Sequence, residues 1–96
     1  MRERIRVMVP STRPGLREEL RAFVLYCIGR IDREVEADTW DVRVAVGAEF
    51  SIEVRAHVGG TSVAARSVGR DPVVATWNAM CQVEQPLREA VRHRAA

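Results

Sequence analysis

Arginine is the residue type in this chain that most clearly indicates a binding function. All 15 strongly basic residues are arginines, because the sequence contains no lysine. Arg17 and Arg21 are one helical turn apart, as are Arg88 and Arg92, so each pair would share one face of a helix. Paired guanidinium groups suit bidentate contacts to the phosphates of nucleic acid. The alternative is that these arginines only solvate helix surfaces, with partners such as Glu84.

The other reactive side chains do not form a catalytic or metal-binding pattern. Cys27 and Cys81 lie in apolar surroundings, which is typical of structural thiols. His57 falls on the polar face of a predicted strand and His93 near the C-terminus, so neither is placed to activate a cysteine. No two Cys or His residues have metal-ligand spacing, and no serine stands in a nucleophile elbow. We therefore predict no enzymatic activity, no metal ion and no cofactor.

Length and composition indicate a single globular domain spanning residues 1–96. Hydrophobic residues make up 47% and charged residues 29%, and the formal net charge of +2 is too near neutral to indicate nucleic acid by itself. The longest apolar run, residues 22–28, is too short to cross a bilayer, and no apolar segment follows Met1 as a secretory signal would require. We expect a cytoplasmic protein that does not contact membranes.

Hydrophobic periodicity predicts six elements. Apolar residues alternate with polar ones over residues 4–9, 40–46, 50–58 and 61–68, and recur every three or four over about 14–35 and 72–93. In the first helix the recurring apolar residues are Leu16, Leu20, either Phe23 or Val24, Cys27, Ile31 and Val35. Gly59-Gly60 is a hairpin signal, and Asp71-Pro72 is a helix cap followed by a favourable first residue. Pro86 removes a backbone hydrogen bond inside the last helix, so we predict a kink or an early end there, with residues 88–94 loosely held.

Alternation in every strand predicts that one face of the sheet is buried and the other is open to water. Both helices then cover the same face, in an α+β fold with two layers and the order βαβββα. A right-handed crossover makes the first two strands parallel, and the other strands follow as a meander. The open face would collect these residues: Arg4, Arg6, Arg43, Glu53, Arg55, His57 and, less directly, Arg66.

Three segments resemble the hibernation-promoting factor family, also called the ribosome-associated inhibitor or sigma-54 modulation proteins. Residues 14–20 are similar to the family's Pro-x-Leu-Arg-x-x-Val opening of the first helix, and residues 50–65 to its hairpin. Residues 71–87 follow the spacing of its last helix, through Ala75, Ala79, Glu84 and Leu87. The resemblance implies a fold similar to a double-stranded-RNA-binding domain with an extra first strand. It also implies binding to the ribosomal RNA of the small subunit and inhibition of translation when growth stops.

The chain departs from the family pattern on its helices. The family often has basic residues where this chain has Ala22, Phe23, Tyr26, Gly29, Gln82 and Gln85, and Trp77 replaces a polar residue. Arg17 and Arg88 are compatible with the pattern. If Phe23, Tyr26 and Trp77 lie outside the core, they form an aromatic surface, and the chain would be a protein-interaction module that forms a homodimer. If the first helix is rotated, the same residues are ordinary core.

Overall fold

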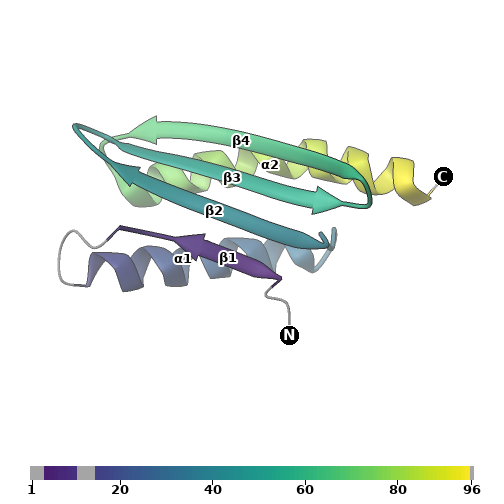
Figure 1. Cartoon of the computed structure of the whole chain (residues 1–96), viewed down its shortest axis with the longest axis horizontal. Helices are drawn as coiled ribbons and strands as arrows, with labels where there is room; N and C mark the ends of the chain where they lie inside the picture. The colour runs from purple at the N-terminus through teal and green to yellow at the C-terminus, as the bar shows by residue number, and fades with distance from the viewer. Residues whose placement is uncertain (1–3, 11–14, 96) are drawn as a thin grey trace.

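The computed structural model describes residues 4–10 and 15–95, apart from the side chains of residues 94 and 95. Its elements are β1 (Ile5–Met8), α1 (Leu16–Asp32), β2 (Thr39–Val46), β3 (Phe50–Val58), β4 (Thr61–Gly69) and α2 (Pro72–Ala95). The strands form one sheet in the order β1-β2-β3-β4, and both helices lie on the same face of it (Figure 1). β1 and β2 are parallel, and the other neighbours are antiparallel. The predicted two-layer βαβββα fold is therefore confirmed.

The hydrophobic core lies between the sheet and the two helices. The apolar side chains of β2 and β3 that point toward the helices are buried, including Trp40, Ile52 and Val54. In α1, the periodicity left open whether Phe23 or Val24 enters the core. Val24 is fully buried and Phe23 only packs against the core from its margin.

α1 ends at Asp32 rather than at the predicted Val35, because the Asp32 carboxylate supports a turn of the chain. It accepts hydrogen bonds from the Trp40 indole Nε1 at 3.1 Å and from the Ala37 backbone N–H at 3.4 Å. A helix that continued past Asp32 could not place Ala37 and Trp40 against that carboxylate. The predicted helix start at Pro14 lies outside the described residues.

The prediction that Arg4 lies on the open face of the sheet is wrong, because its side chain binds the Asp32 carboxylate. Alternation placed Arg4 on the open face of the sheet, but its guanidinium donates to Asp32 at 2.5 Å and to the Ala37 carbonyl at 3.1 Å. Arg4 precedes β1, so the alternation of the strand does not control its direction. The other residues predicted for the open face are exposed or, for His57, half-buried.

The local turn and cap predictions are confirmed. Gly59 has a φ of 61° at the turn between β3 and β4, where positive φ suits glycine. The Asp71 carboxylate accepts hydrogen bonds from the backbone N–H groups of Val73 at 2.9 Å and Val74 at 3.2 Å. These bonds satisfy two N–H groups in the first turn of α2, which have no partner within the helix.

The sequence predicted a kink or an early end of α2 at Pro86, and the early end is wrong, because α2 continues to Ala95. Leu87 is fully buried, and Ala90 and Val91 pack against the core, so the segment after the proline is held by packing rather than loose. Pro86 itself lies on the exposed side of the helix, where water can solvate the carbonyl that lacks its usual partner. Burial of the following residues offsets the missing hydrogen bond.

Candidate nucleic-acid interface

α1 and α2 run in the same direction, and the line along which they face each other is called the seam here (Figure 1). Each helix follows a strand and returns antiparallel to it beneath the sheet, and the two preceding strands are themselves parallel. The N-terminal halves of both helices therefore lie together, and so do the C-terminal halves. This places the sequence-predicted site residues at defined positions along the seam.

The N-terminal half of the seam carries an aromatic cluster, formed by Phe23, Tyr26 and Trp77. The Phe23 ring centroid lies 6.3 Å from that of Tyr26 and 6.4 Å from that of Trp77. Tyr26 is 62% exposed and Trp77 39% exposed. The structure thus brings the three predicted aromatic residues together across the two helices, with Phe23 at the margin of the core and the other two rings open to solvent.

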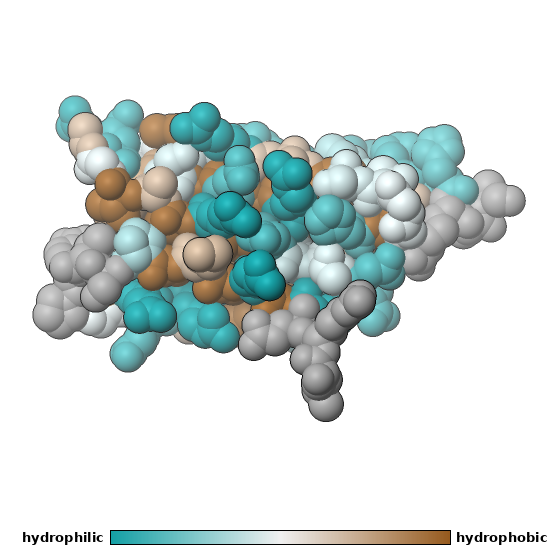
Figure 2. Space-filling view, viewed as in Figure 1, coloured by the Kyte–Doolittle hydropathy of each residue, from teal (hydrophilic) through white to brown (hydrophobic). Residues whose placement is uncertain are grey.

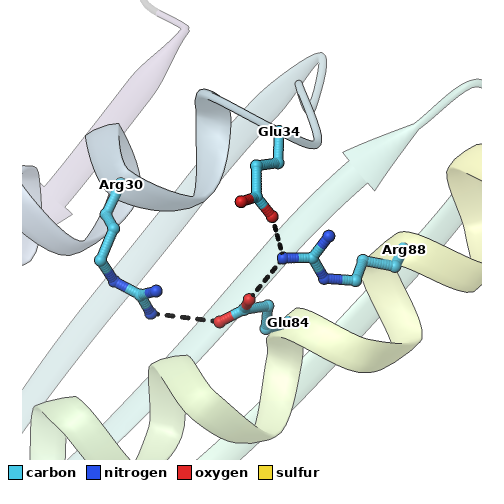
Figure 3. Close-up of polar contacts among 4 residues, drawn as sticks. All are labelled: Arg30, Glu34, Glu84 and Arg88. Carbon is cyan, nitrogen blue, oxygen red and sulfur yellow. Dashed lines mark hydrogen bonds and ion pairs between the residues drawn. The ribbon is translucent and has the colours of Figure 1, made fainter.

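The C-terminal half of the seam carries a network of ion pairs, shown in Figure 3. Glu84 of α2 accepts from Arg30 of α1 at 3.1 Å and from Arg88, one turn further along α2, at 2.8 Å. Arg88 also donates to Glu34, just beyond the end of α1. Two arginines and two carboxylates therefore alternate across the seam, and they join α1 and the turn after it to α2.

The network shifts the pKa values of its members. The hydrogen bond from Arg88, followed by the one from Arg30, holds the pKa of Glu84 below its ordinary value, although partial burial acts in the opposite direction. Hydrogen bonds to Glu84 and then to Glu34 raise the pKa of Arg88. Both shifts mean that the charged forms are favoured in the folded protein.

Arg30 links the two halves of the seam. Its guanidinium carbon lies 5.0 Å from the centroid of the Trp77 ring, in a cation–π contact, while its Nη2 donates to Glu84. Sequence reasoning missed this residue. The feature of the sequence that could have identified Arg30 is its position seven residues after Phe23, because this spacing places both residues on one side of α1.

The four arginines predicted to bind RNA do not form one surface. Arg17 and Arg21 are exposed near the start of α1, with no ion pair to any described residue. Arg88 is engaged by two carboxylates, and Arg92 donates to Glu89 at 3.3 Å. Since Arg88 contacts the turn after α1, it lies roughly 25 Å along the helix from Arg17.

The two cysteines differ in their exposure to solvent. Cys27 and Cys81 are both free, and Cys27 is buried. Burial raises the pKa of Cys27 to about 11, so its thiolate, the nucleophilic form, is disfavoured. Within residues 4–10 and 15–95, no three His, Cys, Asp or Glu side chains group as metal ligands. In the same part of the chain, no helix combines the length and apolar character needed to cross a bilayer.

Comparison with known proteins identifies similar folds. No model of a protein family matches the sequence, and no curated protein does. Among solved structures, the N-terminal domain of Protein Y from Thermus thermophilus matches at a TM-score of 0.67 and 15% identity, over 88% of this chain and 92% of that domain. A ribosomal subunit interface protein from Coxiella burnetii matches at a TM-score of 0.70 and 15% identity, over 96% of this chain and 98% of that protein.

Both matches cover most of this chain and more than nine tenths of the similar structure. The resemblance found in the sequence implied this fold, and the comparisons bear it out. At 15% identity, the positions that line the helices of the two similar proteins need not carry the same residues here. The chain therefore has the fold of the Protein Y N-terminal domain and of the ribosomal subunit interface protein, with a helical seam that is partly aromatic and partly ion-paired.

Proposed function

We propose that this chain is a ribosome-associated factor that inhibits translation, acting in the cytoplasm by occupying a site rather than by catalysis. The similarity of fold to a ribosomal subunit interface protein, over 96% of this chain, is the observation that carries the proposal. The partner in this proposal is the ribosomal RNA of the small subunit, and the protein would act when growth slows under stress. It would need neither metal nor cofactor.

Arg17 and Arg21 are the helical residues that best support such a role. Both are exposed, and neither forms an ion pair with a carboxylate of the described residues. Arg88 is less suited, because its Nη2 already donates to both Glu34 and Glu84. A phosphate that bound Arg88 would have to compete with both carboxylates, which costs more than binding a solvated guanidinium.

Sedimentation with ribosomes through a sucrose gradient at two salt concentrations tests the proposal. We expect the protein to migrate with the small subunit at low salt and to be released at high salt, because phosphate contacts release counterions. Arg17→Glu with Arg21→Glu should abolish the association. The matched control, Arg33→Glu with Arg70→Glu, makes the same charge change at two exposed arginines and should leave it intact. Protein that stays at the top of the gradient at both salts would overturn the proposal.

A second candidate function is self-association through the aromatic cluster. The observation that favours it is the gathering of Phe23, Tyr26 and Trp77 at one place, with Tyr26 and Trp77 exposed. Val73 and Val74, at 44% and 54% exposure, add apolar surface at the start of α2. Replacing Tyr26 and Trp77 with serine should convert a dimer to a monomer in sedimentation equilibrium, and a monomeric parent protein would exclude this function.

A further inference from the structure

The open face of the sheet carries one exposed arginine from each strand. These are Arg6 of β1, Arg43 of β2, Arg55 of β3 and Arg66 of β4. Among the residues that the structure describes on these strands, two carboxylates share the face, Asp41 and Glu53, and both belong to the central strands. Figure 2 shows hydrophilic side chains gathered over the middle of this face. The arginines therefore outnumber the carboxylates on a surface that neither helix covers.

The strand register arranges these charges in a regular way. Arg6, Asp41 and Arg55 stand side by side in one row, and Arg43, Glu53 and Arg66 in the next. Neighbouring strands are about 4.8 Å apart and two residues along a strand span about 6.7 Å, so successive arginines lie about 8 Å apart in a zigzag. The zigzag crosses the sheet over about 14 Å, the width of three steps between neighbouring strands.

Most of these arginines keep their charge available. Arg6 and Arg55 form no ion pair with any residue that the structure describes. Arg66 donates to the neutral Ser51 hydroxyl at 3.1 Å, and Arg43 has an exposed contact of 3.3 Å with Asp41. Such an exposed pair contributes little and is easily exchanged for a contact to phosphate. The face is thus richer in free guanidinium groups than the α2 side of the seam.

The zigzag also connects to the helical site. Arg17 of α1 and Arg43 of β2 line the same surface hollow, beside the end of β1. A basic band therefore runs from the start of α1, past β1, onto the open face of the sheet. At the opposite end of α1, the connection to β2 carries Glu34, Glu36 and Asp38, which would repel a polyanion.

We infer that the phosphate backbone of RNA binds along this band, from Arg17 across Arg6, Arg43, Arg55 and Arg66, rather than across the faces of α1 and α2. The inference rests on the proposed function for its choice of RNA. The excess of arginine over carboxylate matches a polyanion, and the guanidinium fork suits phosphate oxygens. The face would contact mainly the backbone rather than the bases, because the ring that its described residues offer for base stacking, that of His57, is half-buried.

Fluorescence anisotropy with a labelled RNA hairpin, over a series of salt concentrations, tests the inference. Arg6→Gln with Arg55→Gln removes two charges without breaking an ion pair of the described residues, so folding should be preserved. We expect the affinity to fall roughly fivefold per lost contact at 0.1 M salt, with a shallower salt dependence. Asp41→Asn with Glu53→Gln should act in the opposite direction and tighten binding, because it removes both carboxylates from the face.

The matched control is Arg33→Gln with Arg70→Gln, which makes the same charge change outside the sheet and should leave affinity unchanged. Unchanged binding by the sheet variants, or no RNA binding by the parent protein, would overturn the inference. The ribosome sedimentation experiment tests the proposed function independently of the sheet variants. If the protein binds the hairpin through the sheet but does not sediment with ribosomes, the RNA-binding face is supported and the proposed ribosomal function is wrong. If the protein sediments with ribosomes and the sheet variants bind as well as the parent protein, the ribosomal function is supported and the inference about the sheet is wrong.

Discussion

The two halves of the seam between α1 and α2 are held by different forces. In the N-terminal half, Phe23 joins Tyr26 and Trp77 through ring contacts, and Phe23 also packs against the core. In the C-terminal half, Arg30 and Arg88 converge on Glu84 from the two helices. The N-terminal half is stabilised by burial of apolar surface, and salt and pH change this contribution little. The C-terminal half is stabilised by ion pairs, which both salt and pH weaken.

This difference explains why only part of the expected basic surface is free. Arg88 occupies a position compatible with a phosphate contact, but Glu84 and Glu34 engage it. At the aromatic cluster, the Arg30 guanidinium lies over Trp77, and the exposed arginines Arg17 and Arg21 lie nearer the start of α1. The fold can therefore stay the same while the chemistry of the helical surface changes. Here the side chains of Arg30 and Arg88 form contacts between the helices instead of facing a ligand.

The largest effect on stability should come from the aromatic half. Phe23→Ala removes a ring that packs against the core, and we expect the free energy of unfolding to fall by about 2 kcal/mol, less than for a fully buried phenylalanine. Urea denaturation measures the change. The loss should be nearly the same at low and high salt. A strong salt dependence would show that charge, not apolar burial, holds this half together.

The ion-paired half should give a smaller effect that depends on pH. Glu84→Gln should lower the free energy of unfolding by about 1 kcal/mol at neutral pH, as expected for a networked, partly exposed ion pair. The folded-state pKa of Glu84 is depressed, so its contribution is present above the ordinary glutamate pKa of about 4.3 and is lost as the pH falls through the lower, folded-state value.

Urea denaturation of both proteins from pH 7 to pH 3 checks that prediction. The difference between the parent protein and Glu84→Gln should shrink in the acidic range, because the parent protonates its carboxylate while glutamine does not titrate. Glu89→Gln is a suitable control, since the partners of Glu89 among the described side chains, Gln85 and Arg92, are exposed and lie on its own helix. A difference that stays constant across the range would contradict the role given to the Glu84 charge.

The smallest effect should come from Tyr26, the most exposed ring of the aromatic cluster. Tyr26→Ser should change the free energy of unfolding by no more than about 0.5 kcal/mol, because the side chain is largely solvated already. Comparison with Phe23→Ala then separates the residue that stabilises the fold from the one that is available to a partner. A loss as large as that of Phe23→Ala would mean that Tyr26 belongs to the core.

The cores of the helices and strands could be predicted because their periodicity is local. Alternation identified the buried side of β2 and β3, and three- and four-residue spacing identified Leu20, Cys27 and Ile31 of α1. The Gly59 turn and the Asp71 cap were also predictable, since each depends on the backbone of its own few residues. The fold class follows from these elements, because both helices must cover the one apolar face of the sheet.

The errors arose where distant residues decide the outcome. Pro86 does not end α2, because burial of Leu87 against the sheet outweighs a local hydrogen bond. Arg4 leaves the open face because Asp32, distant in the chain, accepts its guanidinium. Neither partner could be identified from spacing along the sequence, since the distance between them is set by how the layers pack.

The sequence by itself determined the order of elements, their apolar faces and hence the two-layer fold, because each depends on the repeat of neighbouring residues. Only the tertiary structure decided which arginines are free. The rotation and parallel alignment of α1 and α2 bring Glu34 and Glu84 to Arg88. The strand register sets four other arginines in a zigzag across the open sheet: Arg6, Arg43, Arg55 and Arg66. The availability of a charge depends on its neighbours in space, and these are fixed by packing between elements.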